Sequence, residues 1–304
     1  MKITFVHTNK AFLPEIDAYR DFFSTYGVET NTGNYESIAI KPDVEWHFMG
    51  THRRRKWTDT LVIHEYASAS MPPFRKIKDQ LKRWGNCTPG FRLFLNRYVQ
   101  QQLGFNDKVP FGFRDMGLPA GTITAPAAVK KQFDFIYAGS VSADMQMNNL
   151  LQLFAGGALQ QHTLLVLARE YQELATQFSR WPNIIFKGPV PQAEVRYWLQ
   201  QAQFGINYKP VIEPHSHQTS TKLLEYLAAD VPVITTDSPW VRHFQQTYGG
   251  SFFYLNEDLS NFTWEKVQGF SYAFPDLSEW TWDKQIRHSG VLEFLQSKYP
   301  GISF

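Results

Sequence analysis

The segment from Thr219 to Glu225 places a cation and a carboxylate at the predicted start of a helix. Thr219 or Ser220 can cap this helix, which puts Lys222 in its first turn. A cation there opposes the helix dipole unless an anion such as a phosphate binds at the same end and uses both the ammonium and the free amides. Glu225 follows three residues later on the same face, where its carboxylate could accept hydrogen bonds from two ribose hydroxyls. A surface ion pair between Lys222 and Glu225 explains the spacing equally well.

Histidines occur at two further places where a titratable ring could act. His64 ends a buried apolar run and is followed by Glu65, so both residues would lie at the carboxyl edge of a sheet. His215 and His217 precede the predicted helix, but two histidines without a third ligand are a weak signal for a metal. We therefore expect no metal ion and no cofactor, and we expect His217 to hydrogen-bond a phosphate or a sugar.

The first half of the chain alternates apolar strand patterns with helical patterns. Strands are predicted at residues 1–7, 46–49, 60–64 and 90–95. Helices are predicted at residues 16–26, 74–84 and 97–103. This alternation is typical of parallel strands joined by crossover helices.

A second alternating series follows a stretch of small residues and prolines at 118–131, which we interpret as a linker. Its strands are predicted at residues 133–138, 163–168, 183–186, 203–208 and 231–235. Its helices are predicted at residues 148–154, 170–180, 193–201 and 220–229.

Together the two series predict an α/β protein made of two tandem Rossmann-like, doubly wound domains. We place these domains at residues 1–125 and 126–304, with the last helix free to pack back on the first domain. Ligands of such sheets bind beyond the carboxyl ends of the strands, so the predicted active site is the cleft between the domains.

Composition supports a folded protein and excludes several classes. Of 304 residues, 43% are hydrophobic and 19% are charged, which excludes a disordered or collagen-like chain. The single cysteine, Cys87, excludes an internal disulfide, and no signal-peptide pattern is present. No run approaches the roughly 20 apolar residues of a membrane-spanning helix. We therefore expect a cytoplasmic protein whose membrane contact is peripheral, at the inner face of the cell membrane.

Charge divides the chain unevenly. Residues 1–125 contain 17 Lys and Arg against 12 Asp and Glu, a net charge of +5. Residues 126–304 contain 13 against 16, a net charge of −3. The first half is therefore the one expected to face an acidic partner.

Residues 222–234 (KLLEYLAADVPVI) resemble the nucleotide-sugar signature of GT-B glycosyltransferases, particularly glycosyltransferase family 4. Residues 135–139 resemble the strand and glycine that open the donor domain of that family, and residues 183–195 resemble a strand-to-helix segment of the same domain. Trp280-Thr-Trp282 resembles the tryptophan that begins the family's last helices, and His64 matches a histidine that closes an N-terminal-domain strand.

The resemblance implies the transfer of a sugar from a nucleotide-diphosphate sugar to an acceptor hydroxyl, in the synthesis of a bacterial surface polysaccharide or glycolipid. The C-terminal domain would hold the nucleotide sugar, and the N-terminal domain a glycan or lipid-linked acceptor. The residues expected at the donor are Gly139, Ser140, Lys187, Lys209, Glu213, Thr219, Ser220, Thr221, Lys222 and Glu225.

Two positions depart from the family pattern. Many members have an acidic residue eight positions before the ribose-binding glutamate, where this chain has His217, and Glu213 is the nearest carboxylate. Members also carry an arginine after the glycine and a lysine about seven residues later, where this chain has Ser140 and Met147. A diphosphate leaving group still requires donors. The candidate substitutes are Lys222, the amides of 219–221, Lys187, Lys209 and Arg169.

An inverting enzyme would need a base near the acceptor hydroxyl. The available residues are His64, Glu65, Glu15 and Asp17, and we include His217 among the catalytic candidates. Simpler alternatives exist, because a histidine at a strand end can cap a backbone carbonyl and Glu65 can pair with a basic side chain. Whether the reaction retains or inverts configuration stays open.

Basic residues of the first half form two groups that could bind an anionic membrane or the acceptor. Arg53, Arg54, Arg55 and Lys56 lie in a predicted loop, and Lys78, Lys82 and Arg83 lie on the predicted helix at 74–84 beside Phe74, Ile77, Leu81 and Trp84. A solvated helix face is the simpler interpretation. We expect no nucleic acid, because no stacking platform accompanies these groups.

Two alternatives to an active transferase remain. The missing cationic residues at 140 and 147 also fit a nucleotide-sugar-binding protein whose catalysis is impaired. The basic first half also fits a membrane- or RNA-binding module on an α/β scaffold.

Overall fold

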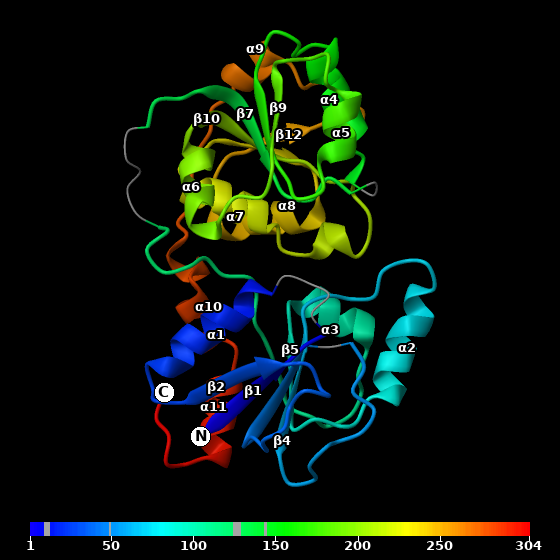
Figure 1. Ribbon diagram of the computed structural model, residues 1–304, viewed down its shortest axis with the longest axis vertical. Helices are drawn as coiled ribbons and strands as arrows, with labels where there is room; N and C mark the ends of the chain where they lie inside the picture. Colours follow the sequence, from blue (N-terminus) through cyan, green and yellow to red (C-terminus); the bar gives the residue numbers. More distant parts are fainter. Residues whose placement is uncertain (9–12, 49, 124–128, 143–144) are drawn as a thin grey trace. The chain divides into compact units, whose positions relative to one another are not determined.

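A computed structural model describes residues 1–8, 13–48, 50–123, 129–142 and 145–304. The chain divides into two compact units, one made of Met1–Ala120 with Glu279–Phe304 and the other of Gly121–Ser278. Each unit contains a six-stranded parallel sheet flanked by helices (Figure 1). The predicted α/β architecture with two Rossmann-like sheets is confirmed.

The first unit has the strand order β2-β1-β3-β4-β5-β6. Its strands are β1 (Lys2–Val6), β2 (Glu29–Gly33), β3 (Val44–Phe48), β4 (Leu61–Tyr66), β5 (Phe91–Phe94) and β6 (Phe111–Phe113). Its first helices are α1 (Pro14–Ser24), α2 (Arg75–Gly85) and α3 (Arg97–Leu103). The order reverses between β1 and β3, so the connections after these two strands diverge and leave room for a ligand at the carboxyl edge.

The C-terminal segment belongs to the first unit. Its helices α10 (Trp282–Arg287) and α11 (Val291–Lys298) contribute Ile286 and Leu295 to the apolar cluster that contains Ile3 and Phe5 of β1. We expected residues 126–304 to form one domain with only the last helix packing back. The second unit instead ends at Ser278, because both terminal helices bury apolar side chains in the core of the first unit. The expected boundary at 125–126 and residues 124–128 of the expected linker lie outside the described residues.

The second unit has the strand order β12-β11-β10-β7-β8-β9. Its strands are β7 (Phe133–Ala138), β8 (Leu164–Leu167), β9 (Ile184–Lys187), β10 (Ala202–Asn207), β11 (Val233–Thr236) and β12 (Phe253–Leu255). Its helices are α4 (Met147–Ala155), α5 (Gln172–Gln177), α6 (Gln192–Gln200), α7 (Thr221–Ala228), α8 (Pro239–Tyr248) and α9 (Trp264–Gln268). This is the order of a dinucleotide-binding sheet, with the reversal between β7 and β10.

Strands β2, β6 and β12 were not predicted, since β2 has no apolar run and β6 and β12 have three residues each. All three lie at the edge of a sheet, as does β9, which was predicted from its apolar run. Strand β2 reads Glu-Thr-Asn-Thr-Gly, without the apolar run of a strand covered on both faces. The central strand β8, which reads Leu-Leu-Val-Leu, is buried throughout and matches its predicted position. Among the described residues, no helix combines the length and apolar character needed to cross a bilayer.

Candidate functional site

Helix α7 is held against the point where the strand order of the second unit reverses. Gly205 in β10 makes the close approach possible, since a Cβ there would lie 2.6 Å from the ring of Tyr226 on α7. The Tyr226 hydroxyl donates to the carbonyl of Ile206 at 3.2 Å and accepts from the amide of Ala138 at 2.9 Å. One side chain thereby joins α7 to both β10 and β7.

Ser220 caps the N-terminus of α7. Its Oγ accepts from the amide of Leu223 at 3.4 Å and donates to Oδ1 of Asn207 at 2.7 Å. Asn207 ends β10, and its Nδ2 donates to Thr235 of β11 at 2.9 Å. The first turn of α7 is therefore oriented by the carboxyl ends of two strands. Its amides face the edge at which ligands of such sheets bind.

Lys222 lies across the loop that follows β7. Its Nζ donates to the Tyr137 hydroxyl at 2.6 Å, and this hydroxyl donates to the carbonyl of Ser140 at 2.5 Å. Gly139 has a φ of 147°, and a Cβ at this position would lie 2.4 Å from Cε of Lys222. The positive φ favours glycine at this position, and a side chain there would displace the lysine stem from its place against the backbone.

Two lysines bring positive charge to this edge. Burial lowers the pKa of Lys222 to about 7, and the nearby charge of Lys209 adds to the effect. Burial also lowers the pKa of Lys209 to about 8, and its Nζ donates to the carbonyl of His215 at 2.7 Å. An anion bound here would stabilise both ammonium groups.

Glu225 lies one turn along α7 from Lys222. Its Oε1 accepts from Nε2 of Gln192 at 3.4 Å. Burial raises the pKa of Glu225, while Gln192 and Lys222 oppose this rise. A partly desolvated carboxylate with one weak protein donor retains the capacity to accept further hydrogen bonds, as from a ribose diol.

The connection from β10 to α7 carries the remaining donor candidates. Nε2 of His217 lies 3.8 Å from Oε1 of Glu213, so the structure brings these two residues together. His215 interacts through Nδ1 with Oε1 of Gln218 at 3.1 Å. Thr219 is half-buried and Thr221 is exposed at the start of α7. These predicted donor residues therefore form one continuous segment.

Lys187 and Arg169 lie at or after the ends of other strands than the residues above, whereas Ser140 lies in the loop after β7 beside Lys222. Lys187 ends β9, which β8 separates from β7, and its Nζ lies 4.3 Å from the centroid of the Trp198 ring. Arg169 is exposed after β8. Met147 is 3% exposed in the apolar core of the second unit, so position 147 of this chain faces away from solvent. Ser140 is exposed, with its Oγ 2.8 Å from Oγ of Ser142.

In the first unit, Glu65 belongs to a buried ion pair. Its Oε1 accepts from Arg114, while its Oε2 accepts from the Tyr19 hydroxyl at 3.1 Å and from Nε1 of Trp46 at 2.8 Å. Glu15 approaches the same guanidinium at 3.6 Å. The pKa of Arg114 is raised by these negative neighbours despite its burial. Glu65 therefore pairs with a basic side chain, which was the simpler alternative to a role as catalytic base. Both of its carboxylate oxygens already accept hydrogen bonds within the unit.

His64 is fully buried in β4. Its Nε2 lies 2.9 Å from Nδ1 of His52, and burial lowers the pKa of His64 well below its usual range. Asp17, the last base candidate, is exposed on α1 beside Arg20 at 3.5 Å. The catalytic roles expected of His64 and Glu65 stay predictions.

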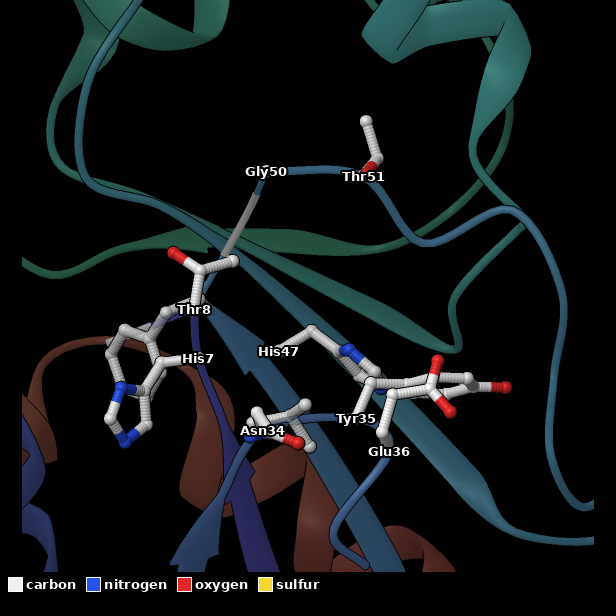
Figure 2. Close-up of a pocket in the computed structure, with 10 residues that line it drawn as sticks. His7, Thr8, Asn34, Tyr35, Glu36, His47, Gly50 and Thr51 are labelled. Carbon is white, nitrogen blue, oxygen red and sulfur yellow. The ribbon is translucent and has the colours of Figure 1, made fainter. Parts of the chain in front are cut away.

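A pocket opens in the first unit where its strand order reverses. Figure 2 shows its lining residues, which come from the carboxyl ends of β1 and β3 and from the loops after β1, β2 and β3. They include His7, Asn34, Tyr35, Glu36 and His47, around a volume of about 280 Å³. Sequence reasoning did not select His7, Asn34, Tyr35 or Glu36. One feature of the sequence could have indicated this pocket: His7 directly follows the first strand of a doubly wound sheet, where ligands commonly bind.

The basic residues expected at a membrane or acceptor lie on the first unit. Arg53, Arg54, Arg55 and Lys56 are exposed between β3 and β4. On α2, Lys78 is exposed, whereas Lys82 is half-buried and Nε of Arg83 donates to the carbonyl of Leu103 at 3.1 Å. Arg83 is thus partly used in holding α2 to α3.

The two six-stranded parallel sheets with their flanking helices are those of the GT-B fold, and solved structures of that fold match the chain throughout. A glycosyltransferase involved in avilamycin A biosynthesis, AviGT4, has a TM-score of 0.57 at 13% identity, covering 98% of this chain and 96% of its own. The lipopolysaccharide outer core galactosyltransferase WaaB has a TM-score of 0.58 at 11% identity, covering 99% and 100%. A T4 phage BGT mutant in complex with UDP-glucose has a TM-score of 0.53 at 13% identity, covering 97% and 92%.

The sequence itself matches no protein-family profile, and no curated protein is significantly similar to it. The chain therefore has the fold of the GT-B glycosyltransferases, established by its structure.

Proposed function

We propose that the protein transfers a sugar from a nucleoside-diphosphate sugar to an acceptor hydroxyl. The observation that carries this proposal is the placement of Lys222 and Lys209 beside the capped N-terminus of α7, at the strand-order reversal of the second unit. Such an edge binds phosphates in doubly wound sheets. The glycosyltransferase titles of the similar structures support the same reaction class.

Each donor residue has a role in this scheme. Lys222, Lys209 and the α7 amides stabilise the diphosphate as the bond between the sugar and its phosphate oxygen breaks. Glu225 accepts from the ribose, and Glu213 with His217 faces the sugar. The acceptor oxygen forms the new bond and loses its proton to a base. Because the two lysines supply positive charge to the leaving group, we expect transfer without a metal ion at the donor.

For the acceptor we propose the pocket of the first unit. His7 and Glu36 line it and offer a titratable nitrogen and a carboxylate, whereas His64 and Glu65 are buried behind hydrogen bonds within the unit. A glycan or lipid-linked acceptor of a bacterial surface polymer fits the basic character of this half.

The donor assignment is tested by thermal unfolding with UDP, GDP, ADP and CDP, each with and without a sugar. We expect one nucleotide to raise the melting temperature of the wild type. Glu225→Ala should abolish the rise, and Glu194→Ala, at an exposed carboxylate on α6, should keep it. A full shift in Glu225→Ala would contradict the ribose assignment.

Transfer and binding are separated with the sugar form of the best nucleotide. Release of the nucleoside diphosphate with a glycan acceptor supports an active transferase. Tight binding without any hydrolysis or transfer would support the impaired binding protein, for which the serine at position 140 and the buried Met147 argue.

Helix α2 supports a peripheral membrane contact. Its inner face holds the buried Asp79, whose carboxylate accepts from the amide of Ser70 at 3.1 Å. Its outer face exposes apolar side chains at helical spacing: Phe74 (71%), Ile77 (55%), Leu81 (62%) and Trp84 (76%). Apolar side chains flanked by lysines and arginines suit an interface of anionic lipid headgroups. We propose that α2 docks the protein on the inner face of the cell membrane.

Co-sedimentation with vesicles tests this contact. We expect binding to phosphatidylglycerol vesicles but weak binding to phosphatidylcholine vesicles, and loss of binding in Leu81→Glu/Trp84→Glu. Ile40→Glu, at another exposed apolar residue of the first unit, is the matched control. Unchanged binding in the double variant would exclude α2 as the docking element. Salt-sensitive binding to single-stranded RNA instead would favour the RNA-binding alternative.

A further inference from the structure

Five side chains that can ligate metals gather in the interior of the first unit. They are Glu45, His47, His52, His64 and Cys87, and all but Cys87 are at most 5% exposed. Within this cluster, His52, His64 and Cys87 offer ligand atoms that all lie within 4.8 Å of one another. Nδ1 of His52 is 2.9 Å from Nε2 of His64 and 3.2 Å from Sγ of Cys87.

The main chain fixes these three residues relative to one another. His64 lies in β4 and pairs in register with His47 of β3. The Cys87 amide donates to the carbonyl of His52 at 2.8 Å, and the His52 amide donates to Oδ1 of Asn86 at 2.7 Å. The loop after β3 and the loop after α2 are thus joined by hydrogen bonds on both sides of the cluster. Its ligand atoms converge by virtue of the fold.

Several polar atoms of the cluster form no hydrogen bond with the described part of the protein. Nε2 of His52, Nδ1 of His64 and Oε1 of Glu45 are buried and have no partner among the described residues. Whichever imidazole donates across the 2.9 Å contact, its second nitrogen carries no proton and has no donor. The accepting imidazole then carries its own proton on a buried nitrogen that has no acceptor. The Cys87 thiol competes for the same His52 nitrogen. Buried polar atoms without a hydrogen-bond partner are rare in folded proteins, so these atoms indicate that a bound group is missing from the cluster.

We propose that His52, His64 and Cys87 bind a metal ion of the Zn²⁺ class. Bonds of about 2.0–2.3 Å at tetrahedral angles would separate the ligand atoms by roughly 3.3–3.6 Å. The distances of 2.9 Å and 3.2 Å from Nδ1 of His52 to its two neighbours therefore need to open by only a few tenths of an ångström. Two imidazoles and a thiolate are ligands that Zn²⁺ prefers. On binding, the thiol proton of Cys87 passes to solvent, and water completes the fourth position.

Glu45 suits a supporting role. It lies with His47 and His52 in a second group of ligand atoms within 4.8 Å, and Oε2 of Glu45 already contacts Nε2 of His47 at 2.8 Å. Once Nδ1 of His52 binds the metal, the proton of this ring resides on Nε2, and the unpartnered Oε1 of Glu45 is the carboxylate oxygen that would accept it. A carboxylate behind a ligating histidine orients the ring and strengthens the ligand. The His47 ring, stacked on His52 at 3.7 Å, fixes the same orientation.

The proposal gives His64 a structural role and differs from our expectation of no metal, which rested on His215 and His217. The spacings of His52, His64 and Cys87 match no recognised metal motif, because three separate elements supply them. The metal site lies in the first unit. The result of a metal-binding test is therefore independent of whether the second unit binds a nucleotide.

Metal content and Co²⁺ spectroscopy of the full-length protein test the site. We expect about one equivalent of zinc to co-purify, and we expect Co²⁺ added after chelation to give tetrahedral ligand-field bands together with a thiolate charge-transfer band. Cys87→Ser should lose the charge-transfer band, and His52→Asn should reduce metal content at least tenfold. His243→Gln, at an exposed histidine of α8, should keep both signals.

A measurement on the wild-type protein tests the site even if a variant fails to fold. Chelation should lower the melting temperature of the wild type, and one equivalent of Zn²⁺ should restore it. No co-purified metal, no Co²⁺ bands and no effect of chelation would overturn the proposal. Co²⁺ binding that lacks the charge-transfer band would also overturn it, because the ion would then lie on Glu45, His47 and His52.

Discussion

At the scale of single residues, Lys222 links nucleotide binding to pH. Burial holds its pKa at about 7 in the free protein, whereas a bound diphosphate would favour the ammonium form. Binding above pH 7 should therefore take up a proton, so the contribution of Lys222 to affinity is complete below pH 7 and falls by up to about tenfold per pH unit above it. Titration calorimetry at pH 7, 8 and 9 in buffers of different ionisation enthalpy measures both effects.

The matched variants isolate this lysine. Lys222→Met should bind weakly with a much flatter pH dependence, leaving only the smaller contribution of Lys209. Lys266→Met, at an exposed lysine of α9, should behave as the wild type. An affinity that rises between pH 7 and 9 would contradict the assignment of Lys222 to the phosphates.

Arg114 is a buried charged residue whose role is to stabilise the fold, in contrast to Lys222, which we assign to ligand binding. Its guanidinium compensates Glu65 and lies 3.6 Å from Glu15. Arg114→Met would leave a buried carboxylate without its partner, so we expect the free energy of unfolding to fall by about 3–5 kcal/mol. Urea denaturation measures this loss. Arg97→Met, at an exposed arginine of α3, should change stability by less than about 0.5 kcal/mol. Equal stabilities of the two variants would refute a structural role for the pair.

At the scale of elements, the N-terminus of α7 combines stability with binding. Ser220→Ala removes the cap and the bond to Asn207, and should cost about 1–2 kcal/mol of stability together with nucleotide affinity. Thr281→Ala removes the cap of α10 in the first unit and should cost a similar amount of stability without changing affinity. Urea denaturation and calorimetry report the two quantities separately. Full affinity in Ser220→Ala would show that the cap does not organise the site.

Elements also show how far the sequence alone could lead. Central strands such as β8 were predictable because burial on both faces demands a continuous apolar run, whereas the edge strand β2 carries polar residues. The cap and first turns of α7 were predictable because residues 219–225 are contiguous in the sequence and carry a capping serine before an apolar face. The pairing of Arg114 with Glu65 was not, since it depends on two segments 49 residues apart in the chain. The cluster around His52 depends in the same way on the register of β3 with β4.

At the scale of the whole molecule, each unit would carry ligands of its own: the second unit the nucleotide sugar, and the first unit the acceptor and the metal ion. Hydrogen exchange with the best nucleotide should show protection within residues 121–278, centred on α7 and the loop after β7. Chelation of the proposed metal should raise exchange in the first unit, around the loops that hold His52 and Cys87. It should leave the nucleotide dissociation constant within about twofold, because additive effects are expected of separate sites. Nucleotide protection centred in residues 1–120 would place the donor in the first unit and overturn the division of roles between the two sheets.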